Sequence, residues 1–150
     1  MEVKRYTKEK IADVLRFEQD LRGEEDFWGW EIDDAYLQKV TQSFEDERFR
    51  SSVSLLAYMD GKVVGRIDST LICSHFDGSV KAYLDWICVL KSYRHRGVAQ
   101  ELMAHLRKVL REQHGADTLI GLIASNGEAQ RFYRSLDHAL IRDEGIWIDL

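Results

Sequence analysis

The feature that most constrains the fold is an abrupt change of character between residues 83 and 115. An apolar run from Tyr83 to Leu90 is followed by a basic turn at 94–96 and a small-residue step at 97–99. From Ala99 onward apolar residues recur at helical spacing until Gly115, a suitable helix C-cap. This order predicts a buried strand, a loop and a helix. Because the first N–H groups of a helix have no partners and lie at the positive end of its dipole, the loop predicts an anion site.

The rest of the chain alternates between short apolar segments and amphipathic ones. Thr7 is expected to cap a first helix and Asp33 to open a second, while Ser125 to Glu128 fits a capping box that opens a third. Asp60-Gly61 predicts a two-residue hairpin, because both central positions of that turn require positive φ. The pattern predicts one mixed α/β domain over residues 1–150. Strands are expected at 3–6, 53–59, 62–72, 83–89 and 118–124, with a closing hairpin of 139–141 and 146–148.

Composition limits the function further. A net charge of −5 argues against nucleic acid as the main partner. No apolar run approaches the ~20 residues that span a bilayer, and no signal-peptide pattern follows Met1, so a cytoplasmic protein without a membrane partner is expected. Cys73 and Cys88 are too far apart for a CxxC site and predict two buried, reduced thiols, with no metal. The oligomeric state stays open, with a homodimer among the states allowed.

Two sets of polar residues allow both a structural and a functional interpretation. Arg94, His95 and Arg96 form either a solvated turn or, with Gly97, Val98 and Ala99, a phosphate-binding loop. The helix start favours phosphate. Asp85 lies in an apolar strand and needs a partner or water. It is expected either to form a salt bridge or edge contact, or to hold an ammonium group and accept its proton.

The chain resembles the GNAT superfamily of acyl-CoA-dependent N-acetyltransferases. The segment Arg94-His95-Arg96-Gly97-Val98-Ala99 fits the Q/R-x-x-G-x-G/A pyrophosphate loop of that family, between a strand and a helix. Asn126, followed by Ala129, Phe132-Tyr133 and Leu136, resembles its second cofactor segment. The resemblance implies a three-layer fold, with helices on both faces of a central, mostly antiparallel mixed sheet. It also implies a splayed parallel strand pair near Val89 and Ile123.

The resemblance assigns acetyl-CoA as co-substrate and gives roles to individual residues. The backbone of Ile87, Cys88 and Val89 would bind the pantetheine arm, and the N–H groups from Arg94 to Ala99 the pyrophosphate. Asn126 would cap a helix, contact the ligand, or do both. Tyr133 is either a half-buried aromatic residue or the acid that protonates the CoA thiolate.

The family's acceptor site implies a role for the acidic, aromatic segment that contains Trp28, Trp30 and Glu31. This segment would attract a cationic amine, or it is simply an exposed loop before a helix. The expected function is acetyl transfer from acetyl-CoA to a primary amine of a small molecule or peptide, by direct attack. The alternative is an acyl-CoA-binding module without transferase activity. Lys91, Ala99 and Asp137-His138 depart from the family's usual residues.

Overall fold

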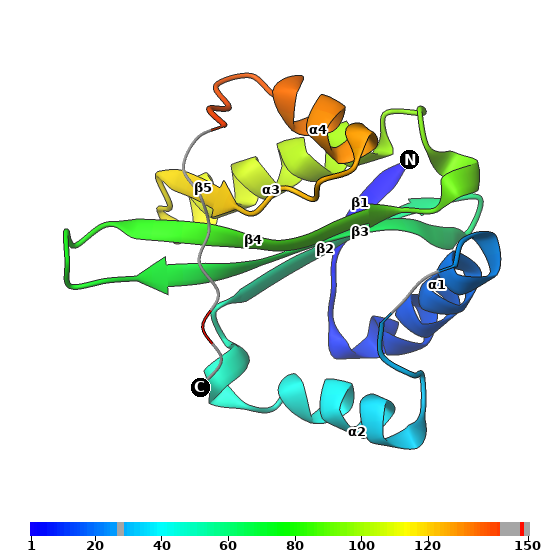
Figure 1. Ribbon diagram of the computed structural model, residues 1–150. Helices are drawn as coiled ribbons and strands as arrows, with labels where there is room; N and C mark the ends of the chain where they lie inside the picture. The colour runs from blue at the N-terminus through cyan, green and yellow to red at the C-terminus, as the bar shows by residue number, and fades with distance from the viewer. Residues whose placement is uncertain (27–28, 142–147, 149–150) are drawn as a thin grey trace. The chain divides into compact units, whose positions relative to one another are not determined.

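The structure is a computed structural model that describes residues 1–26, 29–141 and 148 (Figure 1). The chain separates into two compact units, Met1–Ile120 and Gly121–Leu150. The first contains most of the sheet and three of the helices, and the second contains one helix. The expectation of a single domain over residues 1–150 stays a prediction.

A five-stranded sheet forms the centre of the first unit, in the order β1-β2-β3-β4-β5. Strands β1 to β4 are antiparallel neighbours, and β5 runs parallel to β4. The mostly antiparallel mixed sheet is therefore confirmed. The strands are β1 (Glu2–Arg5), β2 (Ser52–Met59), β3 (Lys62–Cys73), β4 (Val80–Val89) and β5 (Thr118–Gly121).

The β2–β3 hairpin has the predicted turn. Asp60 and Gly61 have φ values of 51° and 77°, and Met59 lies opposite Lys62. Asparagine, aspartate and glycine tolerate the left-handed region better than other residues, which is why this dipeptide specifies the turn.

Helices cover both faces of the sheet in the first unit, with α3 (Val98–His114) on one face and α1 (Ile11–Glu24) on the other (Figure 1). The predicted α/β layer fold is thus confirmed. α3 ends at Gly115, which takes φ 65° as expected of a C-cap. The remaining elements of this unit are α2 (Asp34–Ser43) and the 3-10 turns η1 (Lys8–Lys10), η2 (Glu47–Phe49) and η3 (Lys91–Tyr93).

Gly65 in β3 allows α3 to approach the sheet closely. A Cβ built on Gly65 would lie 2.9 Å from Cγ1 of Val98 and 3.1 Å from Cδ1 of Leu102. Both of these side chains are buried in the first turns of α3. The missing side chain of Gly65 therefore fixes where α3 begins relative to β3.

The second unit contains α4 (Gly127–Arg134). Its N-cap is Asn126, whose Oδ1 accepts the Ala129 N–H at 2.8 Å, so the predicted Ser125 cap is wrong by one residue. Residues 139–141 are described and lie outside any strand, which contradicts the first half of the expected closing hairpin. Of the second half, Ile146 and Trp147 lie outside the described residues.

The first helix also begins later than predicted. α1 starts at Ile11, after η1, and the Thr7 hydroxyl caps neither element. The Thr7 Oγ1 instead accepts a hydrogen bond from Lys10 Nζ at 2.9 Å. A competing local side-chain contact replaces the cap, as short polar side chains often allow.

We predict that Gly65→Ala lowers the free energy of unfolding by about 1–3 kcal/mol, because the new methyl group forces Val98 and Leu102 to shift. Urea denaturation measures the change. Gly23→Ala is the control, because a Cβ at Gly23 in α1 meets no atom within 4 Å. That substitution should be neutral or slightly stabilising. Equal effects of the two substitutions would contradict close packing at Gly65.

Candidate active site

The loop between β4 and α3 has the conformation of an anion site. After η3 (Lys91–Tyr93), His95 and Gly97 both take left-handed conformations, with φ values of 60° and 79°. A Cβ at Gly97 would meet no atom within 4 Å, so this position borders open space. Glycine is required here by its backbone conformation, and its missing side chain also leaves the loop accessible to a ligand.

The N-terminus of α3 supplies hydrogen-bond donors beside this loop. The first i→i−4 hydrogen bond of α3 runs from the Glu101 N–H to the Gly97 O, at 3.0 Å. Three N–H groups precede it in the first turn, and a helix offers such groups no backbone acceptor of its own. They belong to Val98, Ala99 and Gln100.

Arg94 braces the loop from its start. Its Nη1 and Nη2 donate to the Glu25 carboxylate at 3.0 and 2.6 Å, and its Nε donates to Val89 O at 3.2 Å. Its backbone N–H donates to Lys91 O at 3.2 Å. The Arg94 side chain thus joins the end of α1 to the end of β4. A direct contact of Arg94 with phosphate stays a prediction, as does ligand binding by the Val89 backbone.

The neighbouring carboxylate, Glu24, also holds the loop. It accepts hydrogen bonds from the hydroxyl of Ser92 and, at 3.2 Å, from the Ser92 N–H. The hydroxyl contact lowers the pKa of Glu24. Further along, the Arg96 guanidinium lies 5.0 Å from the centre of the Tyr93 ring. Two acidic residues at the end of α1 therefore have a structural role toward the basic loop.

β4 has a bulge at Asp85. Asp68 of β3 lies opposite Trp86 and Ser69 lies opposite Leu84, so Asp85 is the extra residue of the pair of strands. Its side chain is exposed, and its Oδ2 accepts a hydrogen bond from Thr70 Oγ1 at 2.7 Å. Bulges often redirect a side chain beside a functional site. The Thr70 hydroxyl is therefore the hydrogen-bond partner that a carboxylate in this apolar strand requires.

Partial burial raises the pKa of Asp85 above its ordinary value. The hydrogen bond from Thr70 acts in the opposite direction, while the negative charge of Asp68 raises the pKa further. A carboxylate with a raised pKa is a stronger base toward an ammonium group. The position is thus chemically suited to the predicted role, which stays a prediction.

The outer edge of β4 extends beyond β5. Val80 O accepts the Asp117 N–H at 3.1 Å, so the two parallel strands begin side by side. β5 has four residues and β4 has ten. On the side of β4 that faces away from β3, no strand among the described residues other than β5 pairs with β4. Its later half, which contains Ile87 and Cys88, extends past the short β5. Ile123, expected at the splay, lies past the end of β5.

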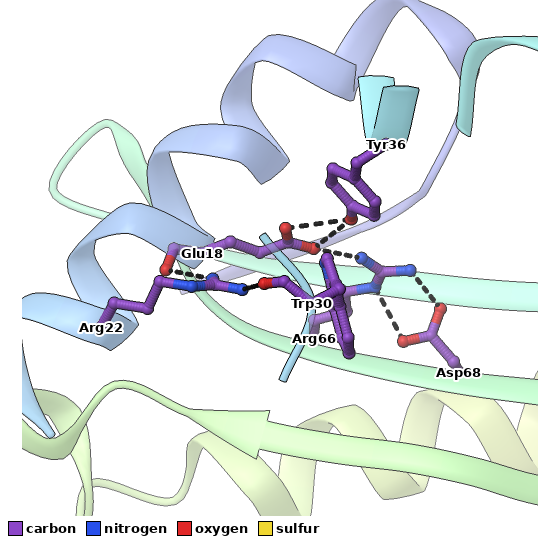
Figure 2. Close-up of polar contacts among 6 residues, drawn as sticks. All are labelled: Glu18, Arg22, Trp30, Tyr36, Arg66 and Asp68. Carbon is purple, nitrogen blue, oxygen red and sulfur yellow. Dashed lines mark hydrogen bonds and ion pairs between the residues drawn. The ribbon is translucent and has the colours of Figure 1, made fainter. Parts of the chain in front are cut away.

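A buried ionic cluster lies on the α1 side of the sheet, where Figure 2 shows the Glu18 carboxylate between Tyr36 and Arg66. Glu18 is fully buried and accepts from the Tyr36 hydroxyl at 2.8 Å and from Arg66 Nη1 at 3.2 Å. Arg66 Nη2 donates to Asp68 Oδ1 at 2.9 Å. The guanidinium is also 4.9 Å from the Tyr6 ring and 5.8 Å from that of Trp86.

Glu18 and Arg66 were not among the predicted site residues. The available signal was the position of Glu18 on the apolar stripe of α1, one turn after Val14 and three residues before Leu21. A carboxylate on a buried helix face requires a cationic partner, because the cost of desolvation is large. The partner itself comes from a strand 48 positions away, and a single sequence does not show such a distant pairing.

Trp30, predicted to bind the acceptor, is 44% exposed and lies beside this cluster. Its ring centre is 5.8 Å from that of Tyr36 and 6.3 Å from that of Trp86. The Arg22 guanidinium is 5.8 Å from the Trp30 ring, and Arg22 Nη2 donates to Trp30 O at 2.6 Å. The Arg22 guanidinium therefore already contacts the Trp30 indole. The indole is still partly exposed to solvent.

Glu31 and Trp28 are the other two residues predicted to bind the acceptor. Glu31 is exposed, and Trp28 lies outside the described residues. Asp33, from the same acidic segment, is the N-cap of α2 and accepts the Tyr36 N–H at 2.7 Å. This contact is the structural role that the helix start implies.

Cys88 lies in the later half of β4 and is partly buried. Burial raises the pKa of its thiol to about 11, although the positive charge of Arg94 acts against this. A thiol with such a pKa is protonated at neutral pH and is a poor nucleophile. Cys73, expected to be buried, is exposed instead, because it ends β3.

Asn126 and Tyr133 belong to the second unit. Asn126 caps α4, as described above, and Tyr133 lies near the end of the same helix, where burial raises its pKa. The Tyr133 ring packs edge-on against Phe132, with centres 5.1 Å apart. A tyrosine with a raised pKa is protonated at neutral pH, so Tyr133 carries the proton that its predicted role requires, and both predicted roles stay predictions.

Two kinds of feature were sought in the part of the chain that the structure describes. No group of three or more metal-binding side chains gathers there. Within the same residues, no helix is both long and apolar enough to cross a membrane.

Comparison with known proteins places this geometry in a family. Residues 11–137 match the model of the acetyltransferase (GNAT) family. No curated protein sequence matches the chain. The matched range includes β4, the loop at 94–99, α3 and α4.

Solved structures share the fold. One is an aminoglycoside acetyltransferase from an uncultured soil metagenomic sample, solved with trehalose, with a TM-score of 0.82 and 14% identity over 99% of this chain and 95% of that one. Another is a ribosomal-protein-alanine N-acetyltransferase from Brucella melitensis biovar Abortus 2308, with a TM-score of 0.75 and 16% identity over 100% and 99%. AAC(6')-Iy, in complex with the bisubstrate analog CoA-S-monomethyl-acetylneamine, has a TM-score of 0.76 and 20% identity over 99% and 97%.

We predict that Arg94 and Glu25 are energetically coupled. In a double-mutant cycle of Arg94→Ala and Glu25→Ala, the coupling in unfolding free energy should be about 1 kcal/mol, because the pair is bidentate and only partly exposed. Urea denaturation of the four proteins measures it. The exposed pair Arg50 and Glu47 is the control, with a coupling near zero. Additive losses at Arg94 and Glu25 would show that the brace does not stabilise the fold.

Proposed function

The chain belongs to the acetyltransferase (GNAT) family, and we propose that it transfers an acetyl group from acetyl-CoA to a primary amine by direct attack of the amine. The observation that carries the proposal is the loop at 94–99. It joins a left-handed Gly97, beside open space, to the donor-rich start of α3. This arrangement is suited to a pyrophosphate group.

The same region offers contacts along an extended cofactor. The N–H groups of Val98, Ala99 and Gln100 are the proposed pyrophosphate donors. Backbone groups of Ile87 and Cys88 lie on the part of β4 that extends beyond β5, where an amide-bearing pantetheine arm could pair with them as a strand would. Acetyl-CoA supplies the thioester carbonyl that the amine attacks.

Asp85 and Tyr133 are the proposed catalytic residues. Asp85 takes a proton from the bound ammonium group, directly or through water, because only the neutral amine is a nucleophile. The neutral amine nitrogen then forms a bond to the carbonyl carbon and loses its second proton to water, while the carbon–sulfur bond breaks. The Tyr133 phenol gives its proton to the departing thiolate. The high pKa of the Cys88 thiol favours this direct route over a covalent relay.

The acceptor is proposed to be a cationic amine of a small molecule or a peptide. Asp85 is exposed on β4, next to Trp86, with Trp30 near that indole. Glu18, Asp68 and Arg66 lie close by and together carry an excess of one negative charge, which attracts cations. The names of two structural neighbours, an aminoglycoside acetyltransferase and a ribosomal-protein-alanine N-acetyltransferase, make aminoglycosides and alanine-containing peptides sensible members of a test panel.

We predict that Gly97→Val weakens acetyl-CoA binding by at least tenfold, since the new side chain enters the open space beside the pyrophosphate donors. Isothermal titration calorimetry with acetyl-CoA measures the affinity. Gly78→Val is the matched control, because Gly78 also has a positive φ, 70°, and open space around its Cβ, but lies in the β3–β4 turn. Wild-type affinity in Gly97→Val would exclude this loop as the cofactor site.

We predict that the protein releases free CoA thiol from acetyl-CoA when a suitable amine is added, as a colorimetric thiol assay detects. Tyr133→Phe and Asp85→Asn should each lower kcat by about 100-fold, which is a typical contribution of acid–base catalysis. Tyr58→Phe is the control, because it removes a tyrosine hydroxyl that is bonded to Asp13. Tight acetyl-CoA binding without thiol release for any amine would instead indicate a binding module.

A further inference from the structure

The contact between Thr70 and Asp85 crosses from one strand to the next at the bulge. Thr70 lies opposite Tyr83 in the β3–β4 register, two residues before the extra residue. A regular ladder would place residue 85 opposite residue 68, whereas at the bulge residue 85 has no ladder partner and its carboxylate is bonded to Thr70. The hydroxyl of Thr70 donates to Oδ2 at 2.7 Å, a short and therefore strong hydrogen bond to a charged acceptor.

This contact restricts the orientation of an otherwise exposed carboxylate. An aspartate on a strand surface samples several rotamers, and a base must be held within hydrogen-bond reach of the proton that it removes. With Oδ2 fixed by Thr70, the carboxylate plane is defined and Oδ1 is the oxygen left for an incoming ammonium group.

We propose that Thr70 is a positioning residue for acceptor deprotonation, which holds the Asp85 carboxylate by one oxygen so that the other receives the proton of the amine. The inference rests on the proposed function and adds a residue to it. Thr70 itself touches neither substrate in this account.

The charged and titratable groups around Asp85 determine in which direction its pKa changes when the Thr70 hydroxyl is removed. From β3, Asp68 acts on it with its negative charge, and Arg66 and Glu18 lie behind Asp68. Within β4, the titratable residues nearest to Asp85 at alternate positions are Tyr83 and Lys81. Lys81 forms an ion pair with Asp77. The residues of β5, Thr118–Gly121, carry no ionisable side chain.

The hydrogen bond from Thr70 lowers the pKa of Asp85, and the charge of Asp68 raises it. Removal of the hydroxyl should therefore raise this pKa. Because the carboxylate acts as a base only when ionised, activity falls as the pH drops through the pKa. The acidic limb of the pH profile should then move to higher pH in the variant.

The experiment compares Thr70→Val, Thr70→Ser and the wild-type protein by two measurements. Carbon-13 NMR of the side-chain carboxyl groups gives the pKa of Asp85 without any need for activity. The pH profile of kcat/KM, from thiol release with the best amine, gives the acidic limb. Thr118→Val is the matched control, since the Thr118 hydroxyl on β5 also donates to an aspartate, Asp117, at 2.8 Å.

Thr70→Val is expected to raise both the NMR pKa and the acidic limb by about one pH unit, with Thr70→Ser restoring the wild-type values. Thr118→Val should change neither. An unchanged NMR pKa in Thr70→Val would overturn the contact, and an NMR shift without a shift of the limb would overturn its role in catalysis. A protein that shows the NMR shift but transfers acetyl to no amine would mark the failure of the proposed function instead.

Discussion

Two adjacent residues of β3, Gly65 and Arg66, constrain both sides of the sheet, because successive residues of a strand point to opposite faces. On one face, the missing side chain of Gly65 lets Val98 approach within a distance that a methyl group would not allow. This contact fixes the first turn of α3 and with it the donor groups of the cofactor loop. On the other face, Arg66 joins Glu18 of α1 to Asp68 of its own strand.

The Arg66 cluster is costly to bury. Glu18 is fully buried, and its carboxylate is satisfied by the Tyr36 hydroxyl as well as by Arg66. Three atoms around it have no hydrogen-bond partner among the described residues: Tyr6 OH, Arg66 Nε and Asp68 Oδ2. The last two lie 2.7 Å apart as an ion pair without hydrogen-bond alignment. Such a cluster gives the segment around Trp30 and α2 a specific attachment to the sheet rather than a large gain in stability.

The residues that could be predicted are those with a local physical requirement. Positive φ angles occur at Asp60-Gly61, Gly97 and Gly115. Glycine and aspartate are residue types that tolerate such angles, so these positions could be predicted. The loop at 94–99 was predicted because strand, basic turn and helix follow one another directly. Asn126 and Asp33 were recognised as residues suited to helix caps, and both cap their helices.

The residues that could not be predicted depend on distant partners. Arg94 was expected to face a phosphate, but its guanidinium is bonded to Glu25, 69 positions earlier. Glu24 and Glu25, just before the segment that contains Trp28, Trp30 and Glu31, hold the loop through hydrogen bonds to Ser92 and Arg94. The bulge that turns Asp85 toward Thr70 is a property of strand pairing, and no residue type in β4 signals it. The acidic character of this part of the chain was visible in the sequence, whereas the contacts of Glu24 and Glu25 with the loop were not.

Acetyl-CoA is proposed to bind along the outer edge of β4 and at the start of α3. Amide hydrogen–deuterium exchange, followed by mass spectrometry with and without acetyl-CoA, tests this proposal directly. Binding there should slow exchange in peptides covering residues 86–101, because the N–H groups there gain acceptors on the ligand, and should leave exchange in the β3–β4 turn at 74–79 unchanged. Saturating acetyl-CoA that leaves exchange across 86–101 unchanged would contradict it.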